Sequence, residues 1–364
     1  MKTVRRLVTI AAAAITAVAM TALPAQAAHT TIKVMPGTGT ISAAVAAAHP
    51  GDTLRLAKGT YNDSVFIPIS LTIEGSGWDT VIMPPATSTN PCNMGGMEGL
   101  CAAGAFDSSG NPDVTKPVVN VRIKDLRTTG FSDTGVLGFN TRGLTVTHVK
   151  SDNNGGYGIA RFVSTDSVFD HNLTSWNGEA GLYMGDSPHA DSIVSHNTSD
   201  NNGYGIFLRD STDITASDNR VFDNCVGIFA LNSGQGSPGD LPAGDYRIID
   251  NSASDNNKAC PGGDHPALSG VGIGLFGVHD TWVSGNVVRD NNSSSDSIAK
   301  GGVVLFSTAF IGGADASNNT VRNNVVKNNK PADIVWDSKG TGNKVQHNNC
   351  RTAIPGNLGW CPGH

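Results

Sequence analysis

A glycine followed by an apolar residue returns at nearly constant spacing through the middle of this chain. The five clearest copies begin at Gly135, Gly158, Gly181, Gly205 and Gly227, so they are 23, 23, 24 and 22 residues apart. A period of that size indicates one small structural unit repeated along an axis, because each unit is too small to bury an apolar face alone. The repeat therefore argues against a fold organised around one globular core.

Each unit contains short runs in which apolar and polar residues alternate, separated by turn residues. In the unit that leads into Gly227, the apolar members are Ile214, Ala216, Val221 and Val226. A period of two is typical of strands with one buried face. Three such runs per unit predict a triangular coil of parallel strands, a parallel β-helix.

Asparagines recur at two turn positions of the repeat. Amides stacked one strand spacing apart, about 4.8 Å, can hydrogen-bond along the coil axis. We therefore interpret both columns as structural ladders. The first contains Asn172, Asn197, Asn219, Asn251, Asn286 and Asn324, and the second contains Asn154, Asn177, Asn202, Asn224 and Asn257.

The segments flanking the repeat predict caps and loops. Thr40 is placed to N-cap a short helix that Pro50 and Gly51 end, and such a helix could cover the open apolar end of the coil. Residues 84–115 lack the repeat and contain two cysteines, which predicts a stapled loop. The expected organisation is a signal peptide at 1–27, a cap with the first coils and the stapled loop at 28–116, the repeat at 117–349 and a C-terminal cap at 350–364.

The first 27 residues have the features of a secretory signal. Lys2, Arg5 and Arg6 precede an apolar run from Leu7 to Leu23, and Ala25-Gln26-Ala27 supplies a small-residue cleavage site. The alternative is an N-terminal membrane anchor, which the cleavage site and the richness in alanine disfavour. We expect a secreted, extracellular protein with no membrane span after cleavage.

The cysteines fit an exported protein. Six cysteines in a secreted chain indicate disulfides, and no Cys-x-x-Cys spacing suggests zinc. Several connectivities are open, and the spacing favours pairs that each bracket a departure from the repeat. These pairs are Cys92–Cys101, Cys225–Cys260 and Cys350–Cys361.

The charge balance excludes some partners. The formal net charge is −6, and it becomes −9 when the three positive charges of the signal segment are removed. An acidic chain without a Lys/Arg cluster does not suit nucleic acid. We therefore expect no nucleic-acid partner, and we expect the chain to be a monomer.

The repeat, as in Asp200-Asn201-Asn202-Gly203-Tyr204-Gly205-Ile206, resembles the right-handed parallel β-helix repeat family. The opening from Thr40 to Val45, followed by Gly51-Asp52-Thr53-Leu54, is similar to the amino-terminal part of many members. The resemblance implies an all-β fold, a single-stranded right-handed parallel β-helix with a short N-terminal capping helix. The family includes pectate lyases, polygalacturonases, mannuronan epimerases and noncatalytic surface proteins, so the fold alone does not select a function.

One segment has a more specific resemblance. Tyr183-Met184-Gly185-Asp186-Ser187-Pro188-His189 resembles the Tyr-x-x-Asp-Pro-His element of mannuronan C5-epimerases, although Ser187 here separates the aspartate from the proline. Ala190 also replaces the acidic residue that usually follows the histidine in that family. The alternative interpretation is a lengthened turn, because Asp, Ser and Pro are common turn residues.

Chemistry on a uronic acid needs a base, an acid and a group that neutralises the carboxylate. His189 or Tyr183 could serve as base or acid, and two arginines on neighbouring repeats could hold carboxylates. Two aspartates at equivalent repeat positions could orient the histidine or hold a cation such as calcium. The candidate catalytic residues are Tyr183, His189, Asp186, Arg161, Arg209 and Asp210.

A second column combines imidazoles and carboxylates next to the first asparagine ladder. Its members are His148, His171, His196, Asp218 and Asp250. Neutral imidazole is a good transition-metal ligand, but side chains in a flat column point in parallel rather than converging. A solvated column and a metal site are both open.

Two functions follow from these observations. The first is a polysaccharide lyase or epimerase that acts on an acidic polysaccharide along one face of the coil. The second is a noncatalytic extracellular protein that binds glycan or has a structural role at a surface. The sequence has no Asp-Asp pair typical of polygalacturonases and no Gly-x-Ser-x-Gly nucleophile motif.

Overall fold

The computed structural model describes residues 29–93, 95–107, 109, 113–235, 242–262 and 266–361. The predicted signal peptide, residues 1–27, lies outside the described residues. Within the described part of the chain, no helix has both the length and the apolar character needed to cross a membrane.

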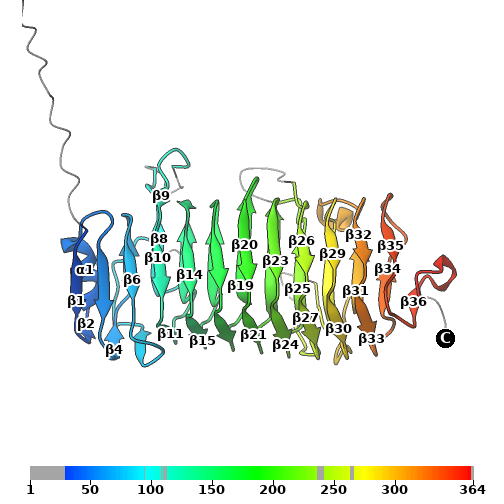
Figure 1. The fold of residues 1–364 in the computed structure, drawn as a ribbon, viewed down its shortest axis with the longest axis horizontal. Helices are drawn as coiled ribbons and strands as arrows, with labels where there is room; N and C mark the ends of the chain where they lie inside the picture. The colour runs from blue at the N-terminus through cyan, green and yellow to red at the C-terminus, as the bar shows by residue number, and fades with distance from the viewer. Residues whose placement is uncertain are drawn as a thin grey trace, which may run out of the picture.

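The described chain winds into an elongated coil whose colours run in order from blue to red along its long axis (Figure 1). Three sheets follow this axis, with 12, 11 and 11 strands in the described residues. Strands pair in parallel with those one coil before and after; Val136–Phe139 pairs with Ile159–Phe162, for example. The structure is therefore the predicted parallel β-helix.

The first sheet consists, in spatial order, of β1 (Thr31–Val34), β3 (Thr53–Leu56), β6 (Thr72–Glu74), β10 (Arg122–Lys124), β14 (Thr145–Thr147), β17 (Val168–Asp170), β20 (Ser192–Ser195), β23 (Ile214–Ser217), β26 (Arg247–Ile249), β29 (Trp282–Ser284), β32 (Thr320–Arg322) and β35 (Lys344–Gln346). The second consists of β2 (Gly37–Thr38), β4 (Gly59–Asn62), β7 (Thr80–Met83), β11 (Arg127–Thr129), β15 (Lys150–Asp152), β18 (Leu173–Ser175), β21 (Thr198–Asp200), β24 (Arg220–Phe222), β27 (Ser252–Ser254), β30 (Val287–Arg289) and β33 (Val325–Lys327).

The third sheet consists of β36 (Ala353–Ile354), β34 (Ile334–Trp336), β31 (Gly301–Phe306), β28 (Val271–Phe276), β25 (Val226–Leu231), β22 (Tyr204–Ser211), β19 (Ala180–Ser187), β16 (Ile159–Phe162), β12 (Val136–Phe139), β8 (Leu100–Ala103) and β5 (Val65–Ile67). A small sheet pairs β9 (Val118–Val119) with β13 (Thr141–Arg142). The helical elements are α1 (Thr40–Ala47), η1 (Ala309–Ile311) and η2 (Gly356–Leu358).

The core fills the inside of the coil. In the third sheet the residue after each repeat glycine points inward, and Ile159, Leu182 and Ile206 stack in register with no exposed surface. Burying such a side chain stabilises the fold by about 1.5–3 kcal/mol relative to leaving it exposed. The apolar repeat positions thus form a continuous column along the axis.

Both asparagine ladders are present, with one correction. In the first ladder the Asn197 amide Nδ2 donates to Asn219 Oδ1 over 3.0 Å, and Asn219 continues to Asn251 over 2.9 Å. In the second ladder Asn224 Nδ2 donates to Asn256 Oδ1 over 3.0 Å. The prediction of Asn257 for this position was wrong, because Asn256 is the fully buried member and Asn257 lies half-buried beside it.

The predicted capping helix exists, but Thr40 is not its N-cap. The N-cap is Gly39, which adopts φ 68°, and the helix begins at Thr40. The free N–H groups of Ile41 and Ser42 each donate to Asp63 Oδ2 over 2.9 Å. Asp63, 22 residues away from Ile41, thus supplies the acceptor that a local N-cap side chain usually provides.

The predicted stapled loop contains a strand. β8 lies within residues 84–115 and pairs with β12 of the third sheet, Leu100 opposite Val136. Gly99 is therefore another lead glycine of the repeat, and a long insertion after it lengthens its spacing to Gly135. The three disulfides are the predicted pairs, Cys92–Cys101, Cys225–Cys260 and Cys350–Cys361.

Candidate functional site

The third sheet has a second apolar layer on its outer face. Alternation places the second residue after each lead glycine on that face, and Tyr183, Phe207 and Phe229 stand opposite one another there. Their ring centroids are 5.3 and 5.0 Å apart, and Phe276 continues the row 4.9 Å from Phe229. Such contacts suit aromatic pairs, and they make this face apolar where a solvent-facing sheet would usually be polar.

A pocket of about 240 Å³ opens over this layer. Segments that lead from the second sheet into third-sheet strands form part of its walls, with Pro266 and Leu268 before β28 and Ile298 before β31. Among the described residues, the charged part of its lining consists of Glu179 and Arg209. The aromatic lining consists of Tyr204, Phe207, Phe229, Phe276 and Phe310. The pocket therefore combines a broad apolar surface with the Arg209 cation and the Glu179 carboxylate.

The Arg209 guanidinium is held in place by Asp210 and Ser233. Its Nε lies 2.9 Å from Asp210 Oδ2, and its Nη2 donates to Ser233 Oγ over 3.1 Å. Burial acts to lower the pKa of Arg209, and Tyr183, Asp210 and Asp186 together outweigh it, so its pKa is raised. Its side chain remains 29% exposed. The guanidinium is therefore charged, oriented and accessible.

Glu179 lies between two tyrosines. The side chains of Tyr157 and Glu179 interact, and burial followed by the Glu179 charge raises the pKa of Tyr157 well above its usual value. Burial and Glu179 also raise the pKa of Tyr204, to about 12. Both phenols are therefore protonated near neutral pH and available as donors.

Glu179, Tyr157 and Tyr204 were not among the residues predicted from the sequence. A signal for the tyrosines was present, because each one directly precedes a lead glycine, Gly158 or Gly205. No regular pattern marked Glu179, since the equivalent residues two positions before Gly135, Gly158 and Gly205 are Asp133, Gly156 and Gly203, and only the first of these is acidic.

Tyr183 forms the floor of the outer layer rather than an open wall. Its side chain is fully buried, with its ring 4.7 Å from Tyr157 and 4.6 Å from Phe162. Burial is the largest of the causes that raise the pKa of Tyr183 well above its usual value. The hydroxyl has no hydrogen-bond partner among the described residues. Tyr183 is therefore placed to shape the site, not to act as a base.

Asp186 and Asp210 occupy equivalent positions, because they directly follow Gly185 and Arg209, which are paired in the third sheet. Both aspartates have a left-handed backbone conformation, with φ of 53° and 46°. Asp210 is fully buried. Its Oδ1 accepts from Ser233 N over 2.7 Å, and its Oδ2 accepts from Ser233 Oγ over 2.5 Å and pairs with Arg209. Because donors engage both oxygens, the geometry at Asp210 suits an ion pair and not a calcium site.

Arg161 points into the coil. It is fully buried, and its Nη1 donates to Ser164 O over 2.9 Å and to Ser187 Oγ. Burial lowers the pKa of Arg161 to about 10. Its Nε and Nη2 have no partner among the described residues. The guanidinium therefore does not reach the pocket on the outer face.

His189 lies on an exposed turn. Its side chain is 87% exposed, and Nδ1 lies 3.3 Å from Asp213 Oδ2. The segment from Pro188 to Ala190 connects the third sheet to the first, as a lengthened turn would. The structure gathers Tyr183, Asp186, Arg209 and Asp210 around one region and places Arg161 and His189 elsewhere.

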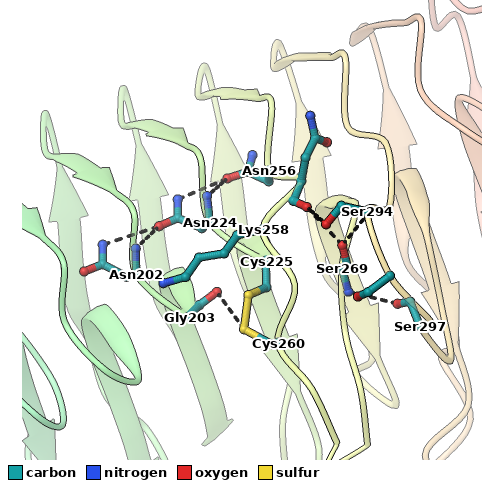
Figure 2. The surroundings of a disulfide bond; sticks show 12 residues. Asn202, Gly203, Asn224, Cys225, Asn256, Lys258, Cys260, Ser269, Ser294 and Ser297 are labelled. Atoms are coloured by element: carbon teal, nitrogen blue, oxygen red, sulfur yellow. Dashed lines mark hydrogen bonds between the residues drawn. A yellow bond between two sulfur atoms is a disulfide. The ribbon is translucent and has the colours of Figure 1, made fainter.

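A disulfide secures one wall of the pocket. Cys225, next to the strand that carries Phe229, is bonded to Cys260, and the backbones of Cys260 and Leu268 exchange hydrogen bonds of 3.0 and 3.1 Å. Figure 2 shows this disulfide beside the second asparagine ladder, with Lys258 nearby. The Lys258 Nζ donates to Asn201 O over 2.8 Å. The segment that carries Leu268 is thus tied to the coil.

Comparisons with known proteins agree with this architecture. A family model described as a right handed beta helix region matches residues 106–239. The Azotobacter vinelandii mannuronan C-5 epimerase AlgE4 A-module is similar in structure, with 15% identity, a TM-score of 0.56, and coverage of 84% of this chain and 90% of that one. For the AlgE6 A-module of the same organism the values are 15%, 0.55, 86% and 87%. The periplasmic alginate epimerase AlgG gives 15%, 0.54, 87% and 76%. No curated protein sequence matches.

Proposed function

We propose that this right-handed parallel β-helix protein binds an acidic polysaccharide in the aromatic pocket of its third sheet and acts on it as a lyase or C5-epimerase. The observation that carries the proposal is the placement of Arg209 and Glu179 in one aromatic-lined pocket. The solved structures with the same fold named above are epimerases of mannuronan or alginate, which supports this substrate class. Three disulfides suit an exported protein.

The pocket offers complementary groups for a uronate residue. Aromatic faces such as Phe207 and Phe229 pack against the C–H faces of a sugar ring. The Arg209 guanidinium can pair with the sugar carboxylate through two parallel hydrogen bonds. Asp210 and Ser233 fix that guanidinium before substrate arrives, so little freedom is lost on binding.

The same groups suit proton abstraction next to a carboxylate. Arg209 stabilises the negative charge that develops on the carboxylate as the C5 proton leaves. Glu179 is the base in this assignment and accepts that proton, with Tyr157 holding the carboxylate in place. In a lyase the electron pair forms the C4–C5 double bond as the C4–O bond breaks, and the Tyr204 hydroxyl protonates the leaving oxygen. In an epimerase a proton returns to C5 from the opposite face.

The test is incubation of the purified chain with alginate, pectate and glycosaminoglycans. Ultraviolet absorbance detects unsaturated chain ends, and NMR detects epimerised residues. Glu179→Gln and Arg209→Gln should abolish product on the substrate that reacts, and His189→Ala should leave product formation unchanged. An absence of product on every polyuronate, or full activity in Glu179→Gln, would overturn the proposal of catalysis.

Noncatalytic glycan binding is the second candidate function. The apolar lining and the ion pair between Arg209 and Asp210 favour it, because binding needs only these features and no proton transfer. Retention of a polyuronate by the wild type, its loss in Arg209→Gln and the absence of product would select this function.

A further inference from the structure

We propose that Asp170, His171 and His196 form a binding site for a divalent transition-metal ion such as zinc, separate from the pocket. The two histidines lie at the bend between the first and second sheets, directly after β17 and β20. The pocket lies on the third sheet. The sequence left a solvated column and a metal site open at this position.

The ligand atoms lie close together around one carboxylate. His171 Nδ1 is 2.7 Å from Asp170 Oδ2, and His196 Nδ1 is 3.0 Å from Asp170 Oδ1. One ligand atom from each residue lies within 4.8 Å of the others. Two atoms that bind the same zinc ion at about 2.1 Å are roughly 3.0–3.5 Å apart, so small rotations of the side chains suffice.

Stacking aligns the imidazoles. The rings of His171 and His196 have centroids 4.7 Å apart and planes 12° apart, and His148 stacks on His171 at 5.3 Å. The Ser195 hydroxyl donates to Asp170 Oδ1 over 2.7 Å and fixes the carboxylate. Side chains in a flat column point in parallel, but Asp170 contacts both imidazoles and so brings the ligand atoms together. Asp170 lies one residue before His171 and was not part of the predicted column.

The backbone does not require histidine here. His148, His171 and His196 have φ of 53°, 54° and 54°, and the equivalent residues of later coils, Asp218 and Asp250, have φ of 57° and 56°. This left-handed conformation tolerates Asp, Asn and His, so an aspartate satisfies the same bend. Consecutive imidazoles around one carboxylate therefore have a role beyond the turn, and two imidazoles with a carboxylate suit zinc and other borderline ions.

The site leaves room for further ligands. The histidine side chains are each 51% exposed, and Asp170 is 26% exposed. Water, or His148 and Asp218 from the adjoining coils, could complete the coordination. An ion here would link two coils by joining His171 to His196.

The experiment is calorimetric titration of the tag-free chain with zinc chloride alone. The wild type should bind one ion per chain, and the double variant His171→Asn/His196→Asn should bind at least tenfold more weakly. Asparagine tolerates the left-handed conformation, so the fold should persist, and circular dichroism checks this. The control is His279→Asn, because His279 also pairs with an adjacent aspartate, Asp280, at 2.9 Å but is not among the proposed ligands. This variant should bind zinc as the wild type does.

A second measurement tests the proposal if the double variant folds poorly. Zinc should raise the melting temperature of the wild type. The increase should be smaller for the single variant Asp170→Asn. Equal zinc affinity in the wild type and the double variant, or equal weakening in His279→Asn, would overturn the proposal. Neither readout depends on activity toward polysaccharide.

Discussion

Arg161 and Arg209 project from opposite faces of the third sheet. Arg161 stands in register with Met184, an inward residue, and Arg209 stands in register with Gly185, its outward neighbour. Side chains alternate across a sheet, so an offset of one position moves a residue from one face to the other. Only Arg209 therefore reaches the pocket.

Replacing Arg161 by methionine should be tolerated. Methionine matches the inward neighbour Met184, and it removes a buried charge whose Nε and Nη2 have no partner among the described residues. Taking a charge out of water costs several kcal/mol, and an apolar side chain of similar volume avoids that cost. The melting temperature should stay level or rise, and product formation on a polyuronate should not change. Loss of activity in a folded Arg161→Met protein would contradict this placement.

Replacing Gly185 by alanine should disturb the outer layer. A Cβ at Gly185 would lie 2.0 Å from the Tyr183 hydroxyl, so the tyrosine ring must move. Overpacking of this kind costs about 1–3 kcal/mol. The matched control is Gly356→Ala, since no atom lies within 4 Å of a Cβ there. Thermal unfolding should show a lower midpoint for Gly185→Ala alone, and equal midpoints would contradict the packing described.

The sequence predicted the scaffold well because the coil repeats the same physical demands at every turn. Inward apolar residues and ladder asparagines recur, so the periodicity reveals them. Asn257 was chosen although the sequence favoured Asn256: Asn177, Asn202 and Asn224 each lie five residues after a member of the first ladder, and the same spacing from Asn251 leads to Asn256. The buried position of Asn256 agrees with that spacing.

The candidate site was harder to predict because its residues do not repeat. The two arginines were placed together because they lie on the repeats to either side of Tyr183. Their positions after Gly158 and Gly205 differ by one, however, and so predict opposite faces of the sheet. Glu179 joins the pocket through packing against Tyr157 and Tyr204, which no local pattern encodes. The capping acceptor Asp63 is likewise distant in sequence from the helix it serves.

Asn256→Ala should be far more destabilising than Asn257→Ala. Asn256 accepts from Asn224 N and Nδ2 and donates to Val221 O and Asn291 Oδ1, all inside the coil. Leaving these groups unpaired should cost about 2–4 kcal/mol. The half-buried Asn257 accepts from Asn292 N, so its loss should cost about 1 kcal/mol. Equal unfolding midpoints for the two variants would place the ladder at the wrong residue.

Removing the disulfide between Cys225 and Cys260 should loosen the pocket wall. The bond closes a loop with a sequence separation of 35, and its loss should cost about 2–4 kcal/mol. Hydrogen exchange of amides around Leu268 should accelerate in Cys225→Ala/Cys260→Ala. The control is Cys350→Ala/Cys361→Ala, which removes the disulfide near the C-terminus and should leave exchange at Leu268 unchanged. Slow exchange in the first variant would show that the wall is held by packing alone.

Glu98 should make the protein less stable as the pH rises toward 8. Burial first, and then the nearby charge of Asp133, raise the pKa of Glu98 from 4.5 to about 8. Between these values the folded chain keeps a proton that the unfolded chain has released. The contribution to stability is therefore present below pH 4.5 and is lost, by at most about 1.4 kcal/mol per pH unit, as the pH rises to about 8.

Glu98→Gln stays neutral and can still accept from Thr134 N, as Glu98 Oε2 does over 2.9 Å. Thermal unfolding from about pH 5 to about pH 8 should show a smaller decline for Glu98→Gln than for the wild type. Identical declines would mean that Glu98 titrates alike in the folded and unfolded chains.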